Sequence, residues 1–195
     1  MSDSSRNSSS GGISSGMTKG PRSSDASGVG DAPDEETVRA ARRRWASGVA
    51  VVTTVQTDGD AKLFRGATID SFQIASVEPP VATFFLETEG EVLKRLITSG
   101  FCAISVLDRS HEFLAERFAG RAPAVDTEFR GVPFHLAETE APILEGALAW
   151  FDCTLELATP MGDHMMLVCR IARLGLGDDT DDPLVTYEAA YRRIE

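Results

Sequence analysis

The sequence contains few of the residues that build metal sites and disulfide scaffolds. Its 195 residues include three cysteines and three histidines. Cys102, Cys153 and Cys169 lie in apolar segments without CxxC spacing, a pattern typical of reduced, buried thiols. The histidines show no metal-ligand spacing either. We therefore expect neither a disulfide framework nor a metal site.

Positive charge is also scarce. Lysine and arginine together number 19 against 30 aspartates and glutamates, which gives a formal net charge of −11. Binding to a phosphate backbone requires clustered cations that displace counterions. Nucleic acid is therefore not an expected partner.

Long hydrophobic runs are missing as well. No segment approaches the roughly 20 apolar residues that cross a bilayer, and the N-terminus lacks the order of a signal peptide. These absences predict a soluble, cytoplasmic protein with no membrane partner. Residues 1–33 are dominated by Ser and Gly, which predicts a disordered tail, whereas residues 34–195 have the apolar content of one folded domain.

Hydrophobic periodicity in this domain favours strands over helices. Strands are predicted at 48–56, 65–74, 80–86, 101–107, 147–157 and 164–174, with a short strand near the C-terminus. A helix at 35–46 is predicted to begin after Asp34, a second to follow a capping box from Thr88 to Glu91, and a third to follow Asp108 or Ser110. The strands follow one another mostly as hairpins. This order predicts an antiparallel barrel, closed or half closed, which leaves no exposed edges.

The segment 65–86 is the most informative part of the chain. It is rich in small and hydroxyl residues that let a flat polar ligand approach the backbone: Gly66, Ala67, Thr68, Ser71 and Ser76. On composition alone, an ordinary antiparallel strand pair is the favoured interpretation.

A family resemblance favours the ligand-binding interpretation. The run G-A-T-I-D-S-F-Q-I-A-S-V-E-P-P at 66–80 resembles the signature G-x-T-x-S-S-F-x-S-V-S-L-x-P-P of the flavin reductase-like family. Further similar runs follow in the family's order: G-V-A-V-V-T-T at 48–54, F-C-A-I-S-V-L at 101–107 and G-D-H at 162–164. The resemblance implies an FMN-binding split barrel, commonly a homodimer. It also implies that NADH or NADPH reduces FMN or FAD, and that the reduced flavin passes to a separate monooxygenase.

The resemblance also implies the site residues. It places the flavin ring against Gly66, Ala67, Thr68, Asp70, Ser71 and Phe72. It places the ribityl phosphate in the loop after Leu86, at Glu87 and Thr88. His164, in the G-D-H run, would orient the nicotinamide as the catalytic residue, with Tyr191 at the border of the same pocket.

Three positions depart from the family pattern. Asp70 stands where a serine is usual, Cys169 replaces a usual glycine, and the run E-T-E-G-E at 87–91 is acidic where the family often has an N-x-S-S-type run. The capping box also predicts that Glu91 occupies the helix N-terminus that would otherwise bind phosphate.

Three functional hypotheses follow. The first is a flavin reductase that binds flavin weakly and releases it as a product. The second is a split barrel without redox chemistry that binds another small molecule or a partner protein. The third is an enzyme with a tightly bound prosthetic flavin. The arginines of the first helix, Arg39 and Arg42 to Arg44, are interpreted either as a solvated face or as phosphate contacts across a dimer interface.

Overall fold

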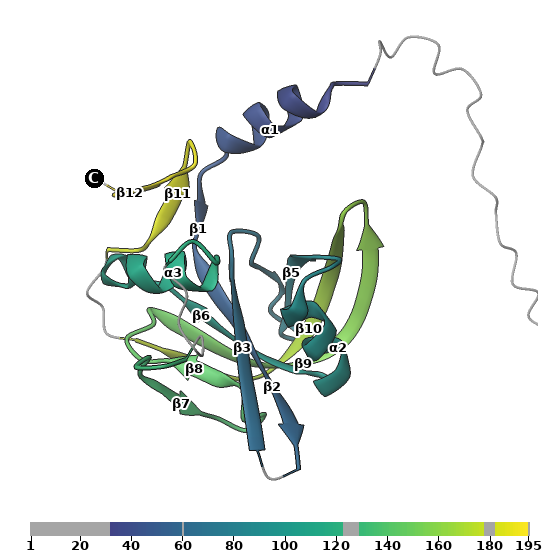
Figure 1. Ribbon diagram of the computed structural model, residues 1–195, viewed down its shortest axis with the longest axis vertical. Coiled ribbons are helices and arrows are strands. Elements are labelled where there is room, and N and C mark those ends of the chain that lie inside the picture. Colours follow the sequence, from purple (N-terminus) through teal and green to yellow (C-terminus); the bar gives the residue numbers. More distant parts are fainter. Residues whose placement is uncertain (1–31, 60, 123–128, 178–181, 195) are drawn as a thin grey trace, which may run out of the picture.

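The computed structural model describes residues 32–59, 61–122, 129–177 and 182–194. The predicted disordered tail lies outside these ranges except for residues 32 and 33, and most of the acidic loop at 177–182 lies outside them too. The described chain is mainly β, with three short α-helices (Figure 1). No helix in these ranges is long and apolar enough to cross a membrane.

The elements follow the predicted order, with shifted ends. The helices are α1 (Glu35–Arg43), α2 (Glu91–Ser99) and α3 (Glu112–Phe118), and a 3₁₀ turn, η1 (Arg109–His111), precedes α3. The longer strands are β2 (Ala50–Asp58), β3 (Ala61–Ile69), β4 (Gln73–Ser76), β5 (Val81–Glu87), β6 (Phe101–Val106), β9 (Ala149–Met161) and β10 (His164–Leu176). The shorter strands are β1 (Ser47–Gly48), β7 (Phe134–Leu136), β8 (Pro142–Leu144), β11 (Val185–Tyr187) and β12 (Ala190–Arg192).

Seven antiparallel strands form the barrel sheet in the order β3-β2-β6-β9-β10-β5-β4. Strands β3 and β4 occupy its two edges, although they are consecutive in the chain. The three residues from Asp70 to Phe72 therefore carry the chain from one edge to the other and half close the sheet. The prediction of a single strand at 65–74 was wrong, because its first half pairs with β2 and its second half with β5.

Alternating side chains from these strands fill the barrel. Phe84, Leu167 and Ile104 are completely buried, and α2 closes the barrel with Val92, Leu93 and Leu96. The predicted reduced state of the cysteines is confirmed, since all three are free and buried. Hydrogen bonding to the Cys153 and Cys169 thiols, together with burial, raises the pKa of Cys102. Cys102 therefore stays protonated in the barrel interior.

Asp152 departs from the side-chain alternation of a strand. Apolar and polar residues alternate in 147–157 and would leave Asp152 on the polar face, but its side chain is completely buried. Its carboxylate accepts hydrogen bonds from the backbone N–H of Glu138 (2.8 Å) and of Thr139 (3.1 Å), and from the Thr139 hydroxyl. The segment before β8 folds over this carboxylate and covers it, which local periodicity does not reveal.

Helix α1 lies apart from the barrel core. Asp34 caps it as predicted and accepts a hydrogen bond from the Thr37 N–H at 2.8 Å. None of its residues is buried, and Figure 1 shows it extending beyond the barrel near β1 and β11. At its C-terminal end the Arg43 carbonyl accepts a hydrogen bond from the Glu188 N–H at 2.8 Å.

Candidate functional site

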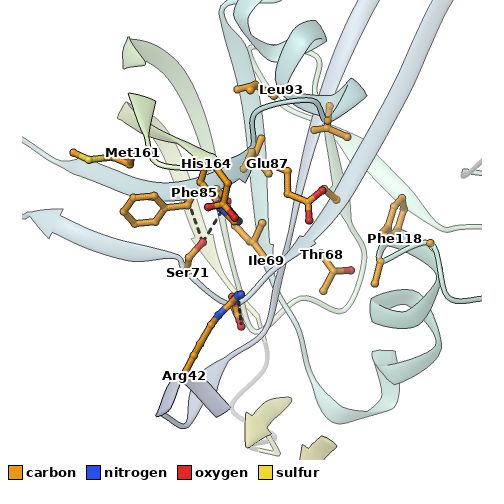
Figure 2. Close-up of a pocket in the computed structure, with 18 of the residues that line it drawn as sticks. Arg42, Thr68, Ile69, Ser71, Phe85, Glu87, Leu93, Phe118, Met161 and His164 are labelled. Carbon is orange, nitrogen blue, oxygen red and sulfur yellow. Dashed lines mark hydrogen bonds and ion pairs between the residues drawn. The ribbon is translucent and has the colours of Figure 1, made fainter. Parts of the chain in front are cut away.

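A cavity of about 1100 Å³ opens beside the barrel, and we refer to it as the main cavity. Its walls come from β3, the end of β5, the start of α2, the β9–β10 turn and α1. Figure 2 shows that side chains from these elements, distant in sequence, face one space. The lining combines small residues of β3 with carboxylates, two arginines and aromatic rings.

The structure brings most of the predicted site residues to this cavity. Those in its lining are Gly66, Ala67, Thr68, Asp70, Ser71, Glu87 and His164. Thr88, Phe72 and Tyr191 are not in the lining. The Phe72 ring packs on Phe151 with ring centroids 5.1 Å apart, and the Tyr191 hydroxyl accepts a hydrogen bond from Arg121 at 3.0 Å. Both aromatic side chains therefore contact other residues and do not line the main cavity.

The hydroxyls along the β3 wall already have protein partners. Thr68 donates to the Ala115 carbonyl of α3 at 2.6 Å, and Ser71 accepts from the Phe85 N–H of β5 at 3.1 Å. A hydroxyl has two acceptor lone pairs besides its proton, so Thr68 retains the capacity to accept from a ligand. The backbone and the small side chains form the rest of this wall.

Gly66 has a packing role in addition to its place in the lining. A Cβ at this position would lie 2.7 Å from the Cδ1 atom of Phe118, which is closer than van der Waals contact allows. The glycine is therefore required by the packing of α3 against β3, and close approach of a ligand is not needed to explain it. Phe118 itself lines the main cavity.

A polar cluster borders the opposite wall, where β5 and the β9–β10 turn meet. His164 pairs across the ladder with Glu87, and its Nδ1 lies 2.7 Å from the Asp163 carboxylate. The hydrogen bond to His164 lowers the pKa of Asp163, and the charge of Arg39 lowers it further. The Thr88 hydroxyl and N–H both donate to the Asp163 carbonyl, at 3.0 and 3.2 Å. Thr88 thus fixes the turn that carries His164.

The start of α2 corrects the predicted capping box. The residue at the N-cap is Gly90, and no side chain caps the helix. The Thr88 hydroxyl points to Asp163 instead, and Glu91 is the first helical residue. Residues 90–93 line the main cavity, so the first-turn N–H groups that α-helices leave unpaired lie at its wall. Such a helix end attracts anions.

The acidic residues near this helix end are partly neutralised by Lys94. Its ammonium lies 3.4 Å from a Glu91 oxygen and 4.0 Å from a Glu89 oxygen. Both carboxylates are largely exposed, with side-chain exposures of 67% and 93%. Water therefore screens their repulsion of an anion at the helix end.

The arginines of α1 were not among the predicted site residues and were considered only as an alternative to a solvated face. Arg39, Arg42 and Trp45 line the main cavity from α1 and the residues after it. Arg42 lies 3.3 Å from Asp70, the residue that departs from the family pattern, and gives this carboxylate a partner. The cluster of arginines in the sequence was the available signal. Its position beside residues 66–71 depends on the tertiary fold.

The chain belongs to the flavin reductase-like family. Residues 42–195 match the family model described as "Flavin reductase like domain". The predicted family and the split-barrel type of fold are both confirmed by this match and by the similar structures described next.

Three relatives illustrate the similarity. The chain is 33% identical over 162 residues to an NADH-dependent flavin reductase of a Rhodococcus species, covering 81% of this chain and 85% of that protein. It is 31% identical over 160 residues to the reductase component of 4-hydroxyphenylacetate 3-monooxygenase of Thermus thermophilus, covering 82% and 97%. The structure matches the flavin reductase component BorF of a bacterial two-component tryptophan halogenase with a TM-score of 0.72, at 31% identity, covering 83% and 98%.

Proposed function

We propose that this protein catalyses the NADH-dependent reduction of FMN or FAD and supplies the reduced flavin to a separate monooxygenase. The observation that carries the proposal is the uncapped N-terminus of α2 at the wall of a cavity in a flavin reductase-like domain. The names of the relatives support the reaction and the donor, because they describe NADH-dependent flavin reductases and reductase components of two-component enzymes. The non-redox hypothesis receives no such support.

The residues of the main cavity fit a flavin. We assign its phosphate to the first-turn N–H groups of α2, and its ring to the β3 wall formed by residues 66–68 with Ser71. When bound, flavin supplies the redox chemistry by accepting a hydride. The protein's part is to bind, orient and shield the two ligands.

His164 is the residue we assign to the nicotinamide. Its Nδ1 meets the Asp163 carboxylate at 2.7 Å, so Nε2 is the nitrogen that we expect to face the ligand. The second histidine of a strand, His135 of β7, packs against Trp150 and does not line the main cavity. It provides a matched control.

Weak binding of flavin agrees with its use as a substrate that must be released. The Ser71 hydroxyl already bonds Phe85, and the Glu89 and Glu91 carboxylates lie near the proposed phosphate site. These features favour a dissociable flavin over a prosthetic one.

We also propose that the protein acts as a homodimer. Exposed apolar side chains of β5 and β9 support this, with Phe85, Leu157 and Met161 exposed by 36%, 52% and 47%. Phe85 and Met161 lie on the same side of the cavity in Figure 2. Leu157→Glu should shift the purified protein towards a monomer in sedimentation analysis, and an unchanged mass would contradict this interface. A cytoplasmic location, where NADH is available and thiols stay reduced, agrees with the three free cysteines.

A turnover assay tests the activity. FMN or FAD is added with NADH or NADPH, and the loss of the nicotinamide absorbance is followed. We expect turnover above the non-enzymatic rate, and about tenfold lower kcat for His164→Ala through loss of one hydrogen bond. His135→Ala should retain the parent kcat. Absence of turnover with every combination of flavin and donor would overturn the proposal.

A further inference from the structure

A second, smaller cavity adjoins the main cavity beneath α1. Its volume is about 220 Å³, and it shares Arg39, Arg42, Trp45 and Asp70 with the main cavity. Arg43 and the β11–β12 turn, which includes Tyr187 and Glu188, complete its walls. The two cavities are therefore neighbours that share a wall formed by the four residues common to both.

Cationic and acidic side chains are unevenly distributed around the main cavity. Among the described residues that line the main cavity, Arg39 and Arg42 are the only lysines or arginines, whereas the carboxylates are Glu35, Asp70, Glu87, Glu91 and Asp163. In a chain with a net charge of −11, an anionic ligand group away from the α2 helix end meets cationic side chains here.

The present partners of these arginines are readily exchanged. Arg39 lies 2.6 Å from Glu35 and Arg42 lies 3.3 Å from Asp70, and the two arginine side chains are 67% and 68% exposed. Exposed ion pairs of this kind contribute little to stability. A guanidinium group binds phosphate oxygens in a fork of two hydrogen bonds. A diphosphate can therefore replace the carboxylates without disturbing the fold.

Trp45 adds a flat aromatic surface beside the arginines. It is 78% exposed and lines both cavities. Large apolar side chains are usually buried in a core or held at a binding site, and α1 buries none of its own residues. An exposed indole offers a stacking surface for a nucleobase.

The main cavity is large enough for a ligand of dinucleotide size. Pockets for one small ligand measure about 300–1,000 Å³, and the main cavity alone has about 1100 Å³. Leu93 at the start of α2 and Arg42 of α1 lie at opposite ends of the view in Figure 2, with Glu87 and Ile69 between them. The α2 end takes the flavin phosphate in the proposed function, which leaves the arginine end for a second anionic group.

We propose that Arg39, Arg42 and Trp45 form a subsite for the adenosine diphosphate group of a dinucleotide. The arginines bind the diphosphate and the indole stacks on the adenine. This inference rests on the proposed function for the presence of a dinucleotide. NADH and FAD both contain this group, and FMN does not.

Binding of ADP to the purified full-length protein, measured by calorimetry, tests the subsite without any turnover. We expect Arg39→Ala/Arg42→Ala to weaken ADP binding about 10- to 100-fold, the range for lost hydrogen bonds to charged groups. Trp45→Ala should weaken it by a smaller factor. Arg44→Ala is the matched control, because Arg44 is an exposed arginine at the end of the same helix that lines neither cavity. ADP binding that is absent, unaffected by the double variant or equally weakened by Arg44→Ala would overturn the proposal.

Two further measurements identify the source of the adenosine diphosphate group. If it belongs to NADH, the double variant raises the KM for NADH with FMN as acceptor and leaves the Kd values of FMN and FAD unchanged. If it belongs to FAD, fluorescence titration shows a weaker Kd for FAD and an unchanged Kd for FMN. An equal loss of FMN and FAD affinity contradicts the subsite. If the protein is not a flavin reductase, no turnover is seen, but the ADP titration still tests the subsite.

Discussion

Helices α1 and α2 are both nine residues long and both border the main cavity, yet they are stabilised in different ways. Helix α2 has no side-chain cap and buries Val92, Leu93 and Leu96 in the barrel. Helix α1 has an aspartate cap and buries nothing. Tertiary packing leaves the first-turn N–H groups of α2 available for a ligand, whereas local interactions leave the side chains of α1 available. The same cavity thus receives backbone donors from one helix and guanidinium groups from the other.

The largest expected effect separates the two helices by burial. Leu96 of α2 is completely buried, so Leu96→Ala should lower the free energy of unfolding by about 2–5 kcal/mol. Val38 of α1 is 51% exposed, and Val38→Ala should change it by less than about 0.5 kcal/mol. Urea denaturation measures both. Equal losses would show that α1 packs as closely as α2.

A carboxylate at the α2 N-cap should weaken the binding of a phosphate at this helix end. Gly90→Asp supplies the missing side-chain cap and a negative charge, which repels a phosphate about 4 Å away by about 1–4 kcal/mol, depending on the effective dielectric. FMN affinity should fall accordingly, whereas riboflavin, which lacks the phosphate, should bind as before. Fluorescence titration gives both constants. A parallel loss of riboflavin would place the phosphate elsewhere.

A third prediction concerns α3, whose packing explains Gly66. Gly66→Ala should destabilise the fold by about 1–3 kcal/mol, because the added methyl group would meet the Phe118 ring at 2.7 Å. Gly48→Ala is the control, since nothing lies within 4 Å of a Cβ at that position. Thermal unfolding compares the two variants. A normal melting temperature for Gly66→Ala, combined with lost flavin affinity, would restore the predicted ligand role.

The smallest effect is expected at the cap of α1. The Thr37 N–H lowers the pKa of Asp34 below its usual value of 3.8, so the capping contribution is present above that pH and lost as the pH falls through the lowered pKa. Asp34→Ala should accelerate amide hydrogen exchange in α1 at neutral pH and leave the barrel amides unchanged. Faster exchange in the barrel as well would mean that α1 and the barrel unfold together.

The barrel was predictable because its strands carry local signals. Alternating and continuous apolar runs indicated β5, β6 and β10, and α2 ends at Gly100, whose positive φ is typical of a glycine after a helix. The strand break at Asp70 was not predicted, although an aspartate is unfavourable inside a strand and was a weak local signal. The break arises from sheet closure, which pairs the two halves with different strands.

The candidate site was predicted in part, and the differences have the same origin. Residues of one strand, such as Thr68, reach the main cavity because a strand keeps its neighbours on a common wall. Thr88 was predicted to belong to the site and to cap α2, but its hydroxyl bonds the Asp163 carbonyl, 75 residues further along the chain. No local pattern records a partner at that separation.

By itself, the sequence determined the β-rich class, the cap of α1, the free thiols and the flavin reductase-like family, because each depends on residue types or on spacing within one segment. The tertiary structure alone decided that α2 lacks a side-chain cap, that Gly66 accommodates Phe118, and that Arg42 contacts Asp70 at the cavity wall. Each of these depends on which segments the barrel brings together, and such contacts are selected by the burial of the whole core.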